Sequence, residues 1–201
     1  TGQGQVMLSR PRTEAEHARL LESQLQELER LNRMVESLLF LARSDPQAPN
    51  QPLQCQTLSA ADELARQADY FADMAEERGL RIAIHGDAPL WAEPALLRRA
   101  LANLLSNALR HATPGSVIEL GAHPDAAGTG AELSVGNQGE PVSAEALPRL
   151  FDRFYRADPA RREGNAEHAG LGLAITRSIV RAHGGEIRCE SAEGSTRFTL
   201  E

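Results

Sequence analysis

The chain lacks the features that mark several large classes of protein. Only two cysteines occur in 201 residues, Cys55 and Cys189, too few for a disulfide framework and without metal-ligand spacing, so a reducing cytosol is the simplest compartment. No apolar run approaches the roughly 18 residues that a membrane-spanning helix requires, and residues 1–10 show no signal-peptide pattern. We therefore expect a soluble chain whose cysteines serve only as packing residues.

An excess of positive charge is also missing. The chain carries 21 Lys and Arg against 28 Asp and Glu, a net charge of -7 at pH 7, which argues against a broad contact with a nucleic-acid backbone. Its 41% apolar and 24% charged residues are ordinary for a soluble globular protein. The length allows one well-buried domain with an appendage, or two small domains.

Residues 12–43 predict one long helix, because apolar side chains recur there at alternating spacings of three and four. Leu31 and Leu38 flank this seam and widen it beyond a two-stranded zipper, which suits a four-helix bundle. Such a stripe must be buried, so we expect a dimer. Residues 5–8 look like the end of an earlier helix, which makes the bundle hairpin incomplete. The seam consists of Leu21, Leu25, Leu28, Val35, Leu39 and Ala42, with Asn32 at the remaining position.

A proline-rich polar segment, residues 45–52, predicts a linker between two domains. We expect residues 1–46 to be a partial helical hairpin, residues 47–54 the linker and residues 55–201 a second domain. Interleaved helical and strand patterns there favour an α+β sandwich with helices on one face of a mixed sheet. The predicted helices span residues 59–78, 93–112 and 171–183, and the predicted strands 80–85, 116–122, 131–136, 186–190 and 196–200.

The most informative motif places two carboxamides, Asn103 and Asn107, four residues apart inside an apolar helical segment. Residues at this spacing share a helix face. A side-chain amide offers an oxygen to a hard cation and N–H donors to phosphate, and Arg110 and His111 follow on the next turn. This combination suits a nucleotide with its magnesium ion.

Two glycine motifs fit the same chemistry. Gly170 and Gly172 come just before a predicted helix, where free N–H groups bind phosphate. Asn137 and Gly139 follow a predicted strand, where an exposed acceptor could receive the exocyclic amine of adenine. Taken alone, each motif is explained equally well by a tight turn.

The order of these motifs resembles the ATP-binding core of bacterial sensor histidine kinases, which share an ATPase superfamily with gyrase, the 90-kDa heat-shock chaperone and mismatch-repair ATPases. The helix before the linker resembles the second helix of that family's dimerisation and phosphotransfer domain. Residues 7–11 and 148–156 resemble the branch that responds to heavy metals such as copper and silver. The N box matches residues 103–111, the G1 box 137–141, the F box 151–154 and the G2 box 170–173.

This resemblance implies roles for individual residues. Asn107 would ligate magnesium, Asn103 would support the phosphate side of the site, and Arg110 would contact phosphate. His111 would lie against the nucleoside, and Asn137 replaces the family's adenine-reading aspartate. The other nucleotide contacts that the resemblance implies are Gly139, Phe151, Phe154, Gly170, Leu171, Gly172 and Leu173.

The sequence departs from the family pattern at Pro141, His168 and Ser195, which stand at or disturb expected glycine positions. We therefore expect the lid, residues 152–169, to move differently from the family's. Several lid arginines are candidates to reach the terminal phosphate, with a solvated basic loop as the alternative. These arginines are Arg153, Arg156, Arg161 and Arg162.

One position separates kinases from hydrolases in this superfamily. Hydrolases carry a glutamate base four residues before the magnesium asparagine, and Asn103 cannot act as a base, so we expect negligible ATP hydrolysis. The phosphoacceptor pattern His-Glu-x-x-Thr-Pro is absent, and His17 falls in the wrong helix, so the chain cannot phosphorylate itself.

The resemblance implies a protein histidine kinase core that presents Mg-ATP to a histidine supplied by a partner, for relay to a response regulator. Its cofactors would be ATP and Mg2+, and the intact protein would be a homodimer in which this part is the cytoplasmic portion of an inner-membrane sensor. A non-catalytic, nucleotide-regulated interaction module is the alternative. A superfamily ATP hydrolase is a third possibility, which Asn103 disfavours.

Overall fold

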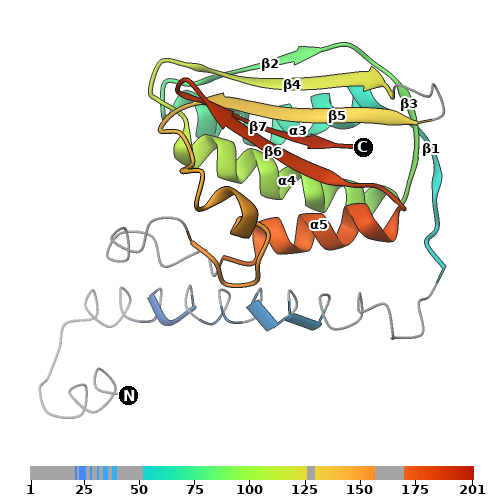
Figure 1. Cartoon of the computed structure of the whole chain (residues 1–201), viewed down its shortest axis with the longest axis horizontal. Coiled ribbons are helices and arrows are strands. Elements are labelled where there is room, and N and C mark those ends of the chain that lie inside the picture. Colours follow the sequence, from blue (N-terminus) through green and yellow to red (C-terminus); the bar gives the residue numbers. More distant parts are fainter. Residues whose placement is uncertain are drawn as a thin grey trace, which may run out of the picture. The chain divides into compact units, whose positions relative to one another are not determined.

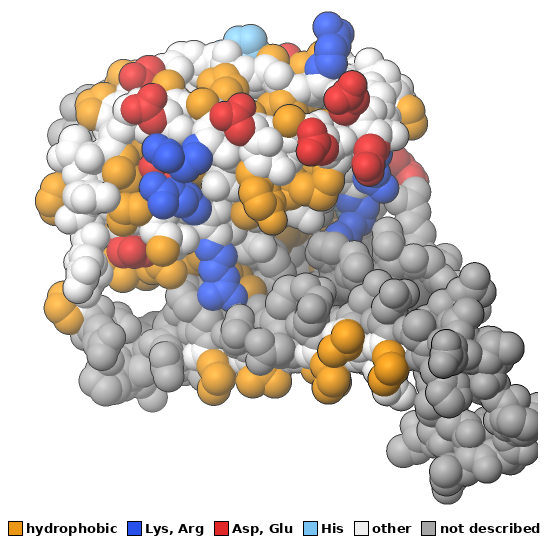
Figure 2. Space-filling view, turned by 180° about the vertical axis from the view of Figure 1, so that it is seen from behind, with side chains coloured by type: hydrophobic (Ala, Val, Ile, Leu, Met, Phe, Trp, Pro, Cys, Tyr) orange, Lys and Arg blue, Asp and Glu red, His pale blue; other side chains and the backbone are white. Residues whose placement is uncertain are grey.

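The computed structural model describes residues 52–125, 130–156 and 170–201, together with individual positions between Leu21 and Leu39. The chain divides into two compact units, Thr1–Leu39 and Phe40–Glu201. All described positions of the first unit are helical, in agreement with the predicted long helix. Apolar side chains stand exposed along it (Figure 2): Leu21, Leu25, Leu28, Leu31, Val35, Leu38 and Leu39.

The predicted bundle, dimer and linker stay predictions, because residues 1–20 and 41–51 lie outside the described ranges. The proposed limits of the domains, 1–46, 47–54 and 55–201, stay predictions for the same reason. Among the helices of the described residues, none combines the length and apolarity that crossing a membrane requires.

The second unit is built on a five-stranded mixed sheet with the strand order β2-β4-β5-β7-β6. β2 pairs in parallel with β4, and the other neighbours are antiparallel. Three helices cover one face of this sheet (Figure 1), which confirms the predicted α+β sandwich. The strands are β2 (Arg81–His85), β4 (Val117–Pro124), β5 (Ala131–Gln138), β6 (Ile187–Ala192) and β7 (Ser195–Leu200); the helices are α3 (Ala60–Glu76), α4 (Pro94–His111) and α5 (Gly172–Ala182).

The predictions from sequence missed a second, two-stranded sheet. β1 (Gln56–Ser59) pairs antiparallel with β3 (Pro89–Ala92). Each strand has only four residues and pairs only with the other, so neither shows the alternation that makes a longer strand recognisable. The short 3-10 helix η2 (Leu147–Arg149) was also not predicted.

Side-chain caps mark where α3 and α4 begin, and a glycine with positive φ follows the end of α3. The Ser59 side chain caps α3 by accepting from the N–H of Asp62, and Gly79 adopts a φ of 65° just beyond its end. The Glu93 carboxylate caps α4 by accepting from the N–H of Leu96 at 2.7 Å. These boundaries agree with the predicted helices to within two residues.

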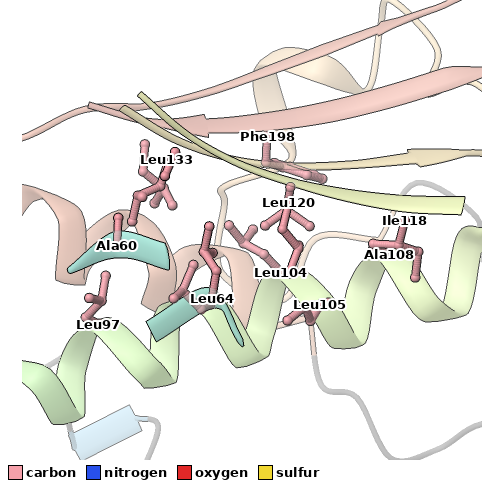
Figure 3. Close-up of a cluster of buried hydrophobic side chains, with 14 of the residues drawn as sticks. Ala60, Leu64, Leu97, Leu104, Leu105, Ala108, Ile118, Leu120, Leu133 and Phe198 are labelled. Carbon is pink, nitrogen blue, oxygen red and sulfur yellow. The ribbon is translucent and has the colours of Figure 1, made fainter. Parts of the chain in front are cut away.

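The core lies between the helices and the sheet, and α4 supplies much of it. Leu104 is fully buried and points toward Leu120 of β4 and Phe198 of β7 (Figure 3). Leu101 and Leu105 of the same helix are also fully buried. This apolar face fixes the rotation of α4 about its axis, so its polar residues must lie along the flanks and the outer side.

An ion pair joins α4 to α3. The Arg98 guanidinium donates two hydrogen bonds to the Glu63 carboxylate, at 2.7 and 2.9 Å, and the Glu63 side chain is only 4% exposed. The hydrogen bonds from Arg98 lower the pKa of Glu63 despite the opposing effect of burial. The carboxylate is therefore charged in the folded protein at neutral pH.

We expect Leu104→Ala to lower the free energy of unfolding by about 3 kcal/mol, because it removes a fully buried side chain and leaves a cavity beneath the sheet. Met74→Ala, at a site on α3 that is 41% exposed, should cost less than about 1 kcal/mol. Urea denaturation followed by circular dichroism measures both. Equal losses would contradict the placement of the core.

We also expect a pH-dependent contribution from Glu63. A carboxylate with a lowered folded-state pKa stabilises the fold above its unfolded pKa and loses that effect as the pH falls through the folded value. The difference in unfolding free energy between the wild type and Glu63→Gln should therefore shrink as the pH falls from about 6 to about 3. Glu119→Gln removes the exposed pair with Arg197 and should change stability little over this range. A difference for Glu63→Gln that does not change with pH would contradict the ion pair.

Candidate functional site

The leucine face of α4 packs against the core. The polar residues of the predicted site lie outside that face. Asn103, Asn107 and Arg110 are half-buried, and His111 is exposed at the last position of the helix. Successive spacings of four and three place the first three of these residues in a row along the helix. The row runs for about two turns and ends where α4 ends.

Asn103 joins this row to the start of α5. Its Nδ2 donates to the carbonyl oxygen of Gly172 at 3.2 Å and to the Thr176 hydroxyl at 3.5 Å. The Thr176 hydroxyl donates in turn to the same Gly172 carbonyl at 3.0 Å. The N box and the G2 box, far apart in the sequence, are therefore in direct contact.

The opposite end of the row meets the end of β5. Ala112 forms an isolated β-bridge with Gly139, and the N–H of Thr113 donates to the Gln138 carbonyl at 2.8 Å. A side chain at Gly139 would overlap the carbonyl oxygen of His111, so the close approach requires glycine. The structure thus brings the G1 box against the last turn of α4.

Asn137 is buried, with 5% of its surface exposed, and lies opposite Thr196 of β7, which is 6% exposed. The predicted strand ended at Gly136, but β5 continues through Gln138 because these residues pair with β7. The N–H of Gly139 also donates to the carbonyl of Gly194 in the turn between β6 and β7, at 2.8 Å. The backbone at Asn137 is therefore held by its pairing with β7 and by the contact of Gly139 with Gly194.

A residue near the start of the predicted lid, Phe154, is held to the residue just after its end, Gly170. The N–H of Phe154 donates to the carbonyl of Gly170 at 3.0 Å, and both residues have positive φ, 64° and 69°. A Cβ at Gly170 would lie 2.8 Å from the Tyr155 carbonyl oxygen, so only glycine fits. A positive φ is costly for phenylalanine and often marks a functional position. Phe154 is 55% exposed.

The other F-box aromatic, Phe151, packs inward. Its ring meets that of Phe198 edge to face at a centroid distance of 6.3 Å. The Arg177 guanidinium of α5 lies 5.8 Å from the centroid of the Phe151 ring, and burial, with the neighbouring charge of Arg181, lowers the pKa of Arg177. Phe151 is thus a link between the sheet and α5.

The first turn of α5 offers backbone donors at the same end of the site. Leu171, the residue that precedes the helix, is buried, and Leu173 is half-buried against the core. No side chain among the described residues caps this helix end. Its first N–H groups are therefore suited to an anionic ligand.

In the described ranges, no group of three or more His, Cys, Asp or Glu is placed to hold a metal. A magnesium ion bound here would take an oxygen from Asn107 and complete its shell with phosphate and water oxygens, as this ion prefers. The donor set of α4 fits that requirement.

Four residues discussed in the sequence analysis lie outside the described residues: the candidate lid arginines Arg161 and Arg162, and also His168 and His17. Arg153 and Arg156 are described and exposed. The two cysteines are free thiols, and burial raises the pKa of Cys189 to about 11, so that thiol is unreactive at neutral pH. Their prediction as packing residues agrees with this environment.

The predictions from sequence missed Thr176 and Thr196, whereas Gly194 was among the glycines expected to lie where the backbone approaches a ligand. Thr176 is fully buried between the apolar residues Ile175 and Ile179 of α5. A hydroxyl on the apolar face of a predicted helix was the signal that could have revealed it, because a buried polar group needs a partner.

Comparison with known proteins finds the following similarities. Residues 92–201 match the family model described as histidine kinase-, DNA gyrase B-, and HSP90-like ATPase. The chain is 43% identical over 200 residues to the sensor protein CzcS of Cupriavidus metallidurans, covering 99% of this chain and 41% of that protein. It is 41% identical over 200 residues to the sensor histidine kinase CusS of Escherichia coli, covering 98% of this chain and 40% of that protein. The chain thus spans about two fifths of the length of these relatives.

Solved structures show the same fold. The structure of full-length ShkA in complex with AMPPNP matches with a TM-score of 0.78 at 24% identity, over 96% of this chain and 39% of that one. The histidine kinase AdeS of Acinetobacter baumannii matches with a TM-score of 0.77 at 21% identity, over 98% of this chain and 88% of that one. At these identities the likeness concerns the fold alone.

We expect Gly139→Ala to lower the free energy of unfolding by about 2 kcal/mol or more, because the added Cβ would overlap the His111 carbonyl oxygen. Gly184→Ala is the matched control, since Gly184 has a φ of 85° but nothing lies within 4 Å of the position that an added methyl group would occupy. It should show only the conformational cost of about 1 kcal/mol. Equal costs, measured by urea denaturation, would mean that the contact between β5 and α4 is not close.

Proposed function

Because this chain belongs to the histidine kinase-, DNA gyrase B-, and HSP90-like ATPase family, we propose that it is the ATP-binding catalytic core of a two-component sensor histidine kinase. It presents the terminal phosphate of Mg-ATP to a phosphoacceptor histidine. The chain does not contain the pattern His-Glu-x-x-Thr-Pro, so the acceptor comes from another segment or chain. The phosphoryl group then passes to an aspartate of a response regulator.

One observation carries this proposal: the row of polar residues along α4 meets the G2 box at its start, at Asn103, and the G1 box at its end. Asn103 bonds to Gly172, and one turn past Asn107 the helix end pairs with Gly139. Asn107 therefore lies between two backbone segments suited to opposite ends of a nucleotide. The phosphates would lie toward the first turn of α5, and the base toward Asn137.

Asn107 would hold the magnesium ion through its amide oxygen. When bound, the ion would supply positive charge that offsets the charge developing on the transferred phosphoryl group. Arg110, on the following turn, would add a positive charge on the same side. Positioning and charge stabilisation of this kind account for most of the rate in phosphoryl transfer.

Asn137 would recognise adenine. Its side-chain oxygen can accept the exocyclic amine, as the family's aspartate does, but without a negative charge. His111 would lie against the nucleoside, and Phe154 and the glycines Gly139, Gly170 and Gly172 would line the approach.

Asn103 supports transfer rather than hydrolysis. A carboxamide cannot take a proton from an attacking water, and its Nδ2 is engaged with the Gly172 carbonyl. Water in the site would therefore lack a general base. The terminal phosphate would therefore be transferred only when a histidine nucleophile is supplied.

The resemblance of residues 7–11 and 148–156 to the branch that responds to heavy metals supports a place in metal-responsive signalling, and the relatives CzcS and CusS are named as sensors. In the intact protein the helix with exposed leucines would form a homodimer, and this part would be the cytoplasmic portion of an inner-membrane sensor. The response regulator is the expected protein partner.

We expect Asn107→Ala to reduce phosphoryl transfer to a supplied histidine phosphotransfer domain by about a hundredfold or more, since the metal contributes several kcal/mol to the transition state. The measurement is transfer of radiolabel from ATP labelled at its terminal phosphate, paired with an ATP titration with and without magnesium. Ser134→Ala removes a buried hydroxyl on the outer face of the sheet and should transfer normally. Unchanged transfer by Asn107→Ala would overturn the metal assignment, and no binding of Mg-ATP by the wild type would overturn the function.

A further inference from the structure

Thr176 is a polar side chain at a position that packing alone would give to an apolar residue. It is 0% exposed, in the second turn of α5, and its neighbours on the buried side of that helix are Ala174, Ile175, Ile179 and Val180. Valine has nearly the same shape without the hydroxyl. A buried hydroxyl adds little stability compared with an apolar group of the same shape. Its value must therefore come from the particular groups that its hydrogen bonds hold in place.

Those hydrogen bonds converge on one carbonyl oxygen. The Thr176 hydroxyl donates to the Gly172 carbonyl at 3.0 Å and accepts from Asn103 Nδ2 at 3.5 Å, while Asn103 Nδ2 also donates to the Gly172 carbonyl at 3.2 Å. The three groups form a closed triangle of one hydroxyl, one amide and one carbonyl. Within it, the shorter contacts are those to the carbonyl.

The triangle fixes which way the Asn103 amide is turned. Both acceptors, the Gly172 carbonyl and the Thr176 hydroxyl, lie on α5, and they pair with the NH2 group of Asn103 and not with its oxygen. Gly172 is also close to Asn103, because a Cβ there would lie 3.6 Å from the Asn103 Oδ1. A carboxamide with one acceptor fewer would be freer to rotate.

The triangle also fixes the first turn of α5 relative to α4. Gly172 is the first residue of α5, and no side chain in the described part of the chain caps the start of this helix. The Gly172 carbonyl is a polar point at which this turn is held against the N box. Asn107 lies one helical turn from Asn103, so the same contact sets the distance between the metal-binding side chain and the phosphate-binding backbone.

We propose that Thr176 is a positioning residue for the triphosphate end of the nucleotide site: its buried hydroxyl holds the Asn103 amide and the first turn of α5 in the arrangement that binds Mg-ATP. It touches neither nucleotide nor metal. This inference rests on the proposed function, since it assigns the phosphates to the part of the site between Asn103 and the first turn of α5.

The test compares Thr176→Val, which removes the hydroxyl at nearly constant shape, with Thr176→Ser, which keeps it. Two ligands are titrated against each: Mg-ATP, which needs the phosphate end, and adenosine, which needs only the base end. We expect Thr176→Val to bind Mg-ATP about fivefold more weakly, the equivalent of one lost hydrogen bond, with adenosine affinity unchanged. Thr176→Ser should bind Mg-ATP within about twofold of the wild type.

Ser134→Ala, which removes a buried hydroxyl on β5, serves as the matched control and should leave both affinities unchanged. Urea denaturation of each variant reports separately on folding. A general loosening of the fold would weaken Mg-ATP and adenosine alike, and that result overturns the inference. So does a Thr176→Val variant with wild-type affinity for Mg-ATP, or a Thr176→Ser variant as weak as Thr176→Val.

The two proposals fail in different ways. If the wild type itself does not bind Mg-ATP, the proposed function is wrong and this inference falls with it. If the wild type binds Mg-ATP but the ratio of its affinities for Mg-ATP and adenosine is the same in Thr176→Val, only the role of Thr176 is wrong.

Discussion

The packing of the leucine face of α4 against the sheet is the constraint on which the rest of the site depends. Leu101, Leu104 and Leu105 are fully buried there, and close packing leaves such a helix little freedom to rotate. A rotation by one residue would carry Asn107 about 100° around the axis, either into the core or away from the α5 side. The position of the candidate metal ligand is thus decided by apolar contacts that it does not itself make.

Polar contacts then determine what lies at each end of the polar row along α4. The amide of Asn103 holds the start of α5, and the backbone around Ala112 pairs with Gly139. Neither contact buries much apolar surface, so neither drives folding. Their effect is to place backbone N–H and C=O groups, which carry the same chemistry in every sequence, at defined distances from a few specific side chains. Catalysis by positioning requires such an arrangement.

The site also contains features that would not be expected in a fold selected for stability alone. Phe154 has a positive φ, and its N–H donates to the carbonyl of Gly170, the residue just after the predicted lid. Thr176 places a hydroxyl in an apolar environment. Both features lie within or beside the G2 and F boxes, whereas the described core between α3, α4 and the sheet consists mainly of leucine, alanine and isoleucine. Departures from simple packing at functional positions are the expected pattern.

Periodicity alone was enough to predict the three helices and the five strands of the main sheet, because each buries one face and so repeats apolar residues at 3.6 or 2 positions. It was not enough for β1 and β3, which are short and gain their order only by pairing with one another across the whole of α3 and β2. The end of β5 was misjudged for the same reason, since only the pairing of Asn137 with Thr196 and of Gln138 with Ser195 extends the strand.

The sequence by itself determined the residue types of the site: which side chains offer amide oxygens, which glycines permit close approach, and the absence of a base at Asn103. Only the tertiary structure decided that Thr176 belongs with Asn103, and that Gly194 and Gly139 meet. The physical reason is that spacing along a chain predicts neighbours only within one helix or strand. Contacts between elements depend on how whole apolar faces pack. The partner of a single hydroxyl or carbonyl therefore cannot be predicted from its position in the sequence.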